Sequence, residues 1–143
     1  MKNTNRKKRK NAPQVRGFYD EVWKANVWLV WPAKNAQIVK IIRRDLGMKW
    51  EPPDADTWAG KCLLIEPKRR GSVQMIVLRG WSLSPESIST LAHECFHAAE
   101  YILSGKVEHC DATSECFAYL TDSIMRRCLR LLMGKKVISQ EWR

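Results

Sequence analysis

A helix signal between Ser84 and Gly105 constrains the fold of this chain more than any other feature of the sequence. The hydroxyl of Ser84 can cap the first turn, Pro85 suits the first helical position, and a glutamate follows at the positive end of the helix. Gly105 provides a stop signal. We therefore predict a helix over 85–103, whose apolar residues need another layer of structure to pack against.

The other apolar patterns predict a small sheet and two further helices. Runs rich in β-branched and aromatic residues predict strands, two of them forming a hairpin, and apolar residues recurring three and four apart predict helices. The predicted strands are 26–31, 61–66 and 72–79, and the further helices are 33–47 and 113–133. We therefore expect an α+β fold in which a small antiparallel or mixed sheet packs on helix 85–103 and on a C-terminal helix.

Composition places the chain among single-domain proteins without a membrane segment. Of its 143 residues, 45% are hydrophobic and 28% charged, which is ordinary for a globular protein. No apolar run approaches the roughly 20 residues of a membrane span, and no secretory signal is recognisable. The 5 cysteines are dispersed and lack a CxxC pair, which favours reduced thiols over a disulfide framework. We expect a cytoplasmic protein with no membrane partner.

The net charge of +10 has a strong N-terminal contribution. Residues 2–10 read KNTNRKKRK and contain no acidic or apolar side chain. Such a segment cannot bury enough apolar surface to offset the entropy lost on ordering, so we expect a disordered tail over 1–14 and one folded domain over 15–143. The tail suits a nucleic acid or another acidic partner, or it serves as a solubilising segment.

The segment LAHECFHAAEY, within the helix predicted over 85–103, contains His93 and His97 with Glu94 between them. Residues four apart lie about 40° apart around a helix axis, so both imidazoles face one side and can bind a single cation. Zinc prefers such nitrogen ligands, and Glu94 is placed to act as a general base on a zinc-bound water. The alternative is a polar helix surface, which the flanking LA and AA disfavour because unpaired imidazoles among apolar residues are costly.

A catalytic zinc usually takes a third protein ligand. The histidine that a metzincin would place six residues after His97 is absent, since that position is Leu103. Three downstream residues remain as candidates. Glu115 lies in the first turn of the next predicted helix, and we favour it. His109 and Asp111 lie in the linker before that helix and are alternatives, although Asp111 can also cap the helix.

Other polar residues on the two helices can support the ligands or the substrate. Glu100 lies three residues after His97 on the same face, where it can accept a hydrogen bond from a ligand. Tyr119 and Asp122 share a stripe with Glu115, so either can orient a histidine or contact substrate. Each also has an ordinary interpretation: Glu100 as a solvated charge, Tyr119 as a packed tyrosine, and Asp122 as an exposed or capping aspartate.

The motif HECFH, followed by a glutamate in ECFAYL, resembles the gluzincin branch of zinc metallopeptidases. In its short form it is similar to small zincin-like proteins encoded by bacteriophages, and the resemblance covers about residues 72–125. It implies one zinc per chain, held by His93, His97 and Glu115. It also implies that Glu94 is the general base that activates a zinc-bound water for hydrolysis of a peptide bond.

The resemblance further implies a minimal zincin-like fold, with strand 72–79 at a sheet edge along which a protein or peptide substrate aligns. The chain departs from larger gluzincins because it has no room for a substantial C-terminal subdomain and no histidine after Glu115 to stabilise an oxyanion. Tyr101, Tyr119 and Arg79 are candidate substitutes. A phage-encoded protein of this kind would work in the host-cell cytoplasm or in the virion.

A second hypothesis retains the fold without turnover. The protein would then be a zincin-fold binding protein or a phage structural protein, with zinc structural or absent and with nucleic acid contacted through residues 2–10. The small size and the missing oxyanion donor favour this hypothesis. The presence of Glu94 favours the enzyme instead, because a purely structural site has no need of a base.

Overall fold

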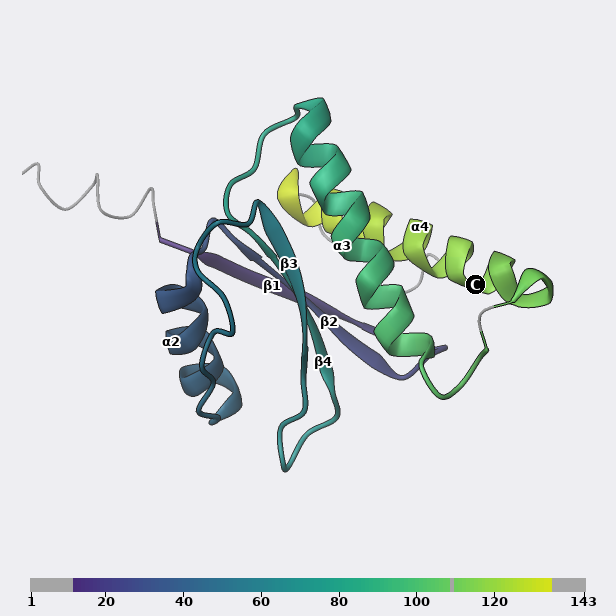
Figure 1. Ribbon diagram of the computed structural model, residues 1–143, viewed down its shortest axis with the longest axis horizontal. Helices are drawn as coiled ribbons and strands as arrows, with labels where there is room; N and C mark the ends of the chain where they lie inside the picture. The colour runs from purple at the N-terminus through teal and green to yellow at the C-terminus, as the bar shows by residue number, and fades with distance from the viewer. Residues whose placement is uncertain (1–11, 109, 135–143) are drawn as a thin grey trace, which may run out of the picture.

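The structure, a computed structural model, describes residues 12–108 and 110–134 (Figure 1). In chain order the elements are β1 (Gln14–Asp20), β2 (Ala25–Trp31), α2 (Asn35–Leu46), β3 (Gly60–Ile65), β4 (Val73–Leu78), α3 (Pro85–Leu103), the short 3-10 helix η1 (Asp111–Thr113) and α4 (Ser114–Leu132). The predicted α+β class is confirmed. In the described part of the chain, no helix combines the length and the apolar character that crossing a membrane requires.

The strands form one mixed sheet in the order β1-β2-β4-β3. β2 pairs parallel with β4, whereas β1 pairs antiparallel with β2 and β3 pairs antiparallel with β4. Every residue of β4 is buried, as is typical of a strand with both faces covered and a neighbour on each side. The prediction that strand 72–79 forms a sheet edge is therefore wrong. The edge strand on that side is β3.

Helices cover both faces of the sheet (Figure 1). On one face, Ile76 and Leu78 of β4 and Leu29 of β2 belong to a core shared with α3 and α4. On the other face, Met75 and Val77 of β4 belong to a core shared with α2. Because successive residues of a strand point to opposite faces, β4 contributes to both cores and forms the centre of the molecule.

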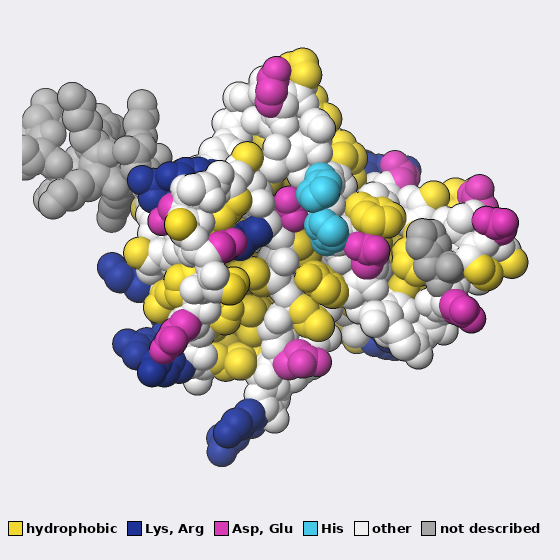
Figure 2. All heavy atoms as spheres, in the orientation of Figure 1, with side chains coloured by type: hydrophobic (Ala, Val, Ile, Leu, Met, Phe, Trp, Pro, Cys, Tyr) yellow, Lys and Arg dark blue, Asp and Glu magenta, His cyan; other side chains and the backbone are white. Residues whose placement is uncertain are grey.

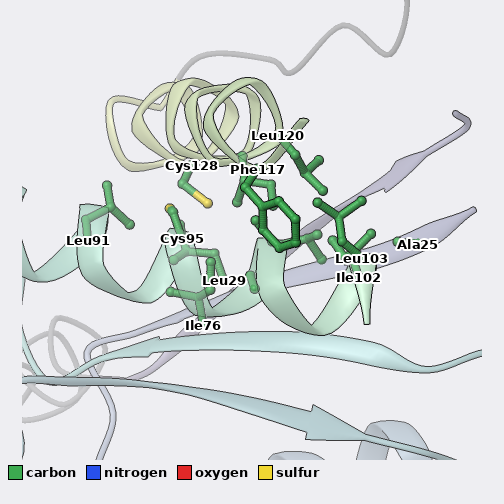
Figure 3. Packing of buried hydrophobic residues seen from close by; sticks show 14 of the residues in the cluster. Ala25, Leu29, Ile76, Leu91, Cys95, Ile102, Leu103, Phe117, Leu120 and Cys128 are labelled. Carbon is green, nitrogen blue, oxygen red and sulfur yellow. The ribbon is translucent and has the colours of Figure 1, made fainter. Parts of the chain in front are cut away.

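The contact between α3 and α4 is built from apolar side chains (Figure 3). Phe117 and Leu120 of α4 lie against the C-terminal end of α3, beside Leu103. Further along α4, the thiols of Cys95 and Cys128 face each other across the contact, and both residues are fully buried. This contact fixes how α4 is placed relative to the helix that carries the histidine motif.

The local helix signals are confirmed. α3 spans the predicted residues 85–103, and the Ser84 hydroxyl accepts a hydrogen bond from the backbone N–H of Ser87 at 3.2 Å. α2 ends at Gly47, whose φ of 64° is a conformation that glycine adopts without steric cost. These signals act within one turn of the chain, which is why the sequence predicts them well.

The first strand, β1, is not predicted by the sequence. β1 begins at Gln14, inside the tail expected over 1–14. Residues 2–10, the basic part of that tail, lie outside the described residues. The side chains of β1 are mostly exposed, so the strand has no strong apolar pattern. Backbone pairing with β2, from the Gln14–Trp31 pair to the Asp20–Ala25 pair, holds it in the sheet.

Candidate metal centre

α3 carries the two motif histidines on its solvent side, where they lie next to each other on the surface (Figure 2). His93 is exposed and His97 is half-buried, while Leu91, Cys95 and Ala98 of the same helix are buried in the core. The Nε2 atoms of the two imidazoles lie 3.1 Å apart. The ring planes are close to perpendicular, at 85°. At this distance the two Nε2 atoms form a hydrogen bond with each other, in which the donor is the ring that carries its proton on Nε2.

The histidine pair fits a zinc ion. Two nitrogens that each lie 2.0–2.1 Å from one zinc ion are about 3.3 Å apart at a tetrahedral angle. The 3.1 Å between His93 Nε2 and His97 Nε2 is close to that value. Neutral imidazole is also among the ligands that zinc prefers. The distance between the two nitrogens is therefore compatible with both binding one ion.

Glu100 orients the second histidine. Its Oε2 atom lies 2.9 Å from Nδ1 of His97. When the proton of the neutral His97 ring is on Nδ1, where it donates to this carboxylate, Nε2 carries a lone pair available to a metal. A carboxylate bonded to the distal nitrogen of a ligand is a common support of metal-binding histidines. Glu100 thus makes the contact expected of it.

Glu94 is buried beside the edge strand, with only 6% of its surface exposed. The backbone N–H of Cys62 in β3 lies close enough to the carboxylate to favour its charged form. Burial raises the pKa of Glu94, whereas the nearby His93 and His97 and the Cys62 N–H act in the opposite direction. A carboxylate next to the two histidines, with a raised proton affinity, has the properties of a general base.

Gly60, which the sequence reasoning missed, allows β3 to approach α3 at this point. A Cβ atom at position 60 would lie 2.6 Å from Thr90 Cγ2 and 3.1 Å from Glu94 Cγ. A glycine at a strand end is the only local signal of such an approach, and it is a weak one. A cavity of about 310 Å³ opens here, which we call the α3–β3 cleft. Its lining residues are Ala59, Gly60, Ser89, Thr90, His93 and Glu94.

The described residues do not bring a third predicted ligand to the histidine pair. Within 12–108 and 110–134, no three His, Cys, Asp or Glu side chains are grouped so that they could hold a metal ion. Glu115 is exposed in the first turn of α4, and Asp111 is exposed in η1. His109 lies outside the described residues. The ligand roles of these three residues stay predictions.

The packing of α4 on α3 explains where Glu115 lies. Cys95, two residues before His97, faces Cys128 near the C-terminal end of α4 (Figure 3). Glu115 is on the same helix as Cys128 but about 20 Å nearer its N-terminus, at 1.5 Å per residue. The first turn of α4 therefore extends away from the point where α4 contacts the motif.

Two of the residues expected to support the site have other surroundings. In the described part of the chain, Asp122 forms an ion pair with Arg126, one turn later on α4, and not with a histidine. Tyr119 is 67% exposed. Both are on the same solvent-facing stripe as Glu115, as the helical spacing predicts. A contact with substrate remains a prediction for each.

The two other candidate oxyanion donors lie closer to the cleft. Burial, followed by the neighbouring Cys62, Glu100 and Glu94, raises the pKa of Tyr101, so its hydroxyl stays protonated and can donate a hydrogen bond. Arg79 donates to a backbone carbonyl in the loop before β3. It also lines a cavity of about 370 Å³ that shares two lining residues with the α3–β3 cleft.

Comparison with known proteins does not assign a family. No family model matches the chain, and no match was found among curated proteins or among solved structures. The gluzincin resemblance therefore rests on the HECFH motif with its downstream glutamate, and the arrangement of His93, Glu94 and His97 has to be argued from its own geometry.

Proposed function

We propose that the protein is a zinc-dependent peptidase that hydrolyses peptide bonds in a protein or peptide. The observation that carries the proposal is the 3.1 Å approach of His93 Nε2 and His97 Nε2, with the buried carboxylate of Glu94 beside them. A zinc ion held by these histidines would polarise the scissile carbonyl and acidify a water molecule. The third ligand in this proposal is Glu115, with His109 and Asp111 as alternatives.

The chain's own residues would carry the proton transfers. Glu94 would take a proton from the attacking water and deliver it to the leaving amine, and its raised pKa supports this role. The Cys62 N–H would keep the carboxylate in place between these steps. Glu100 would hold His97 through Nδ1. Tyr101 or Arg79 would donate to the oxygen on which negative charge develops.

The substrate would align along β3. This strand is the sheet edge next to α3, and Glu94 lies against it beside Gly60. An extended peptide can add to such an edge through main-chain hydrogen bonds. A peptide paired with β3 would run past the α3–β3 cleft, so its scissile bond would reach Glu94 and the histidines.

A second candidate function is a zincin-fold binding protein or phage structural protein without turnover. The exposed position of Glu115 and the lack of a three-residue metal group in the described residues favour it. The burial of Glu94 against β3 favours the enzyme, since a solvated carboxylate would be expected at a surface without chemistry. The zincin-like assignment of the fold, the phage origin and the location in a host-cell cytoplasm or virion also stay predictions.

Zinc content is the first test. We expect about one zinc per chain by elemental analysis after refolding with the metal, and loss of it in His97→Ala. Glu115→Ala should weaken zinc binding about 100-fold or more in competition with a chelator, and Asp122→Ala, on the same exposed stripe, is the matched control. Zinc retained in Glu115→Ala would move the third ligand to His109 or Asp111. A wild-type chain that binds no zinc would overturn the proposal.

Turnover is the second test. A quenched fluorescent casein substrate should be cleaved by the zinc-loaded chain, and Glu94→Gln should lower the rate by about 10²–10⁴-fold while zinc content is unchanged. This variant keeps the shape of the side chain and removes its basicity. Full zinc occupancy with no turnover on casein or on a random peptide library would favour the binding protein.

A further inference from the structure

A groove with basic walls lies between the C-terminal end of α2 and the turn that joins β3 to β4. It encloses about 770 Å³, more than twice the volume of the α3–β3 cleft at about 310 Å³. Lys and Arg side chains gather over this part of the molecule (Figure 2). The charged lining residues are Arg44, Asp45, Lys49, Lys68, Arg69 and Arg70. We call this feature the α2–hairpin groove.

The groove has an excess of positive charge that its own acidic residue does not neutralise. Asp45 is already engaged, since Nε and Nη2 of Arg44 donate to its two carboxylate oxygens at 2.6 and 2.8 Å. On the hairpin side, the side chains of Lys68 and Arg69 are exposed and make no hydrogen bond or ion pair with any described residue. These two cations are free to bind an external anion.

We propose that the α2–hairpin groove binds the phosphate backbone of a single nucleic-acid strand without reading its bases. A polyanion can contact cations on both walls at once, from α2 on one side and from the hairpin on the other. Arginine offers a planar fork of donors that matches phosphate oxygens, and Arg69 and Arg70 of the hairpin line the groove, whereas the fork of Arg44 is already bound to Asp45.

The lining disfavours a membrane surface as the partner. Its apolar residues Leu46 and Pro67 are buried, and Met48 is half-buried. The groove therefore offers no exposed apolar side chain for insertion between lipid headgroups, which surface-bound proteins normally use. The groove shares no residue with the histidine pair or the α3–β3 cleft, so this inference does not depend on the proposed peptidase activity. It is also separate from residues 2–10.

The test is fluorescence anisotropy of the full-length chain with a labelled mixed-sequence DNA strand of about 20 nucleotides, over a range of salt concentrations. The variant is Lys68→Glu with Arg69→Glu, both exposed, with folding checked by circular dichroism. The matched control is Arg16→Glu with Lys34→Glu, on β1 and at the start of α2, which are also exposed and change the net charge equally. Neither control residue lines the groove.

We expect the groove variant to weaken DNA binding about tenfold more than the control. Its salt slope should fall by about 1.4, since each lost phosphate contact on a single strand removes about 0.7. Equal losses in both variants, or none in either, would overturn the proposal. The proposal would also be overturned if the groove variant lost binding to anionic vesicles or to polyglutamate, tested in parallel, but kept its binding to DNA. If the charge reversal disturbs folding, the variant Lys68→Ala with Arg69→Ala replaces it. This variant must also weaken DNA binding more than the control does, although by a smaller factor.

Discussion

At the scale of the residue, Gly60 decides how closely the edge strand can approach the histidine helix. Its missing side chain leaves room for Thr90 and Glu94, the residues that a Cβ atom would meet. The close approach also brings the Cys62 N–H near the Glu94 carboxylate, where it favours the charged form. The orientation of the proposed base therefore depends on a residue that carries no chemistry of its own.

We expect Gly60→Ala to lower the free energy of unfolding by about 1–3 kcal/mol, because its methyl group would lie 2.6 Å from Thr90 Cγ2. Thr90→Ser removes that carbon, so the double variant should recover part of the loss. Urea denaturation of the single and double variants measures both effects. Gly80→Ala is the control, since a Cβ atom there meets nothing within 4 Å. An unchanged stability of Gly60→Ala would contradict the expectation.

At the scale of the element, a buried ion pair joins α4 to the end of β1. Arg127 Nη1 lies 3.4 Å from Asp20 Oδ2, and both side chains are over nine-tenths buried. The Arg127 guanidinium also lies over the ring of Phe18, 5.0 Å from its centre. One position earlier on α4, Arg126 pairs with Asp122 in solvent. The two pairs contain the same residue types and differ in burial.

Burial should make the two pairs respond differently to removal of the aspartate. Asp20→Ala leaves the buried Arg127 guanidinium without this carboxylate, also removes the acceptor of the Trp23 N–H, and should cost roughly 3 kcal/mol of stability. Asp122→Ala removes an exposed i,i+4 partner and should cost roughly 0.5 kcal/mol or less. Thermal and urea unfolding of the two variants provide the comparison. Similar losses in both would show that burial does not set the strength of the Asp20–Arg127 contact.

At the scale of the whole molecule, Lys61 connects three separate parts of the fold. Its Nζ atom donates to the Asp54 carboxylate at 2.8 Å and to Asn35 Oδ1 at 3.0 Å, and it lies over the Trp58 ring, 4.4 Å from its centre. β3, the loop before it and the start of α2 are therefore held together by one ammonium group. The hydrogen bond from Lys61 lowers the pKa of Asp54 from its ordinary 3.8.

The direction of this pKa shift predicts a pH dependence. Because the folded-state pKa is the lower one, the Asp54–Lys61 bond contributes its full stability above about pH 4 and loses it as the pH falls through the lowered value. We expect Asp54→Asn to be less stable than wild type at pH 7, with a gap that narrows in acid. Urea unfolding of the variant and the wild type at pH 7 and in acid tests this, with Glu51→Gln as the exposed control. A constant gap would refute the linkage.

The candidate site could be predicted from the sequence only where its geometry is local. His93 and His97 face one side because they are one helical turn apart, and Glu100 reaches His97 for the same reason. The burial of Glu94 against Cys62 could not be predicted, because the two residues belong to elements that meet only when the helix packs on the sheet. The position of Glu115 depends in the same way on how α4 crosses α3.

The sequence by itself determined the ends of α3, the turn that ends α2 and the pairing of the β3–β4 hairpin, since caps, glycines and adjacent strands interact over a few residues. Only the tertiary structure decided that β3 and not β4 is the sheet edge. That choice comes from the parallel pairing of β2 with β4, which joins segments far apart in the chain and is driven by burial on both faces of β4.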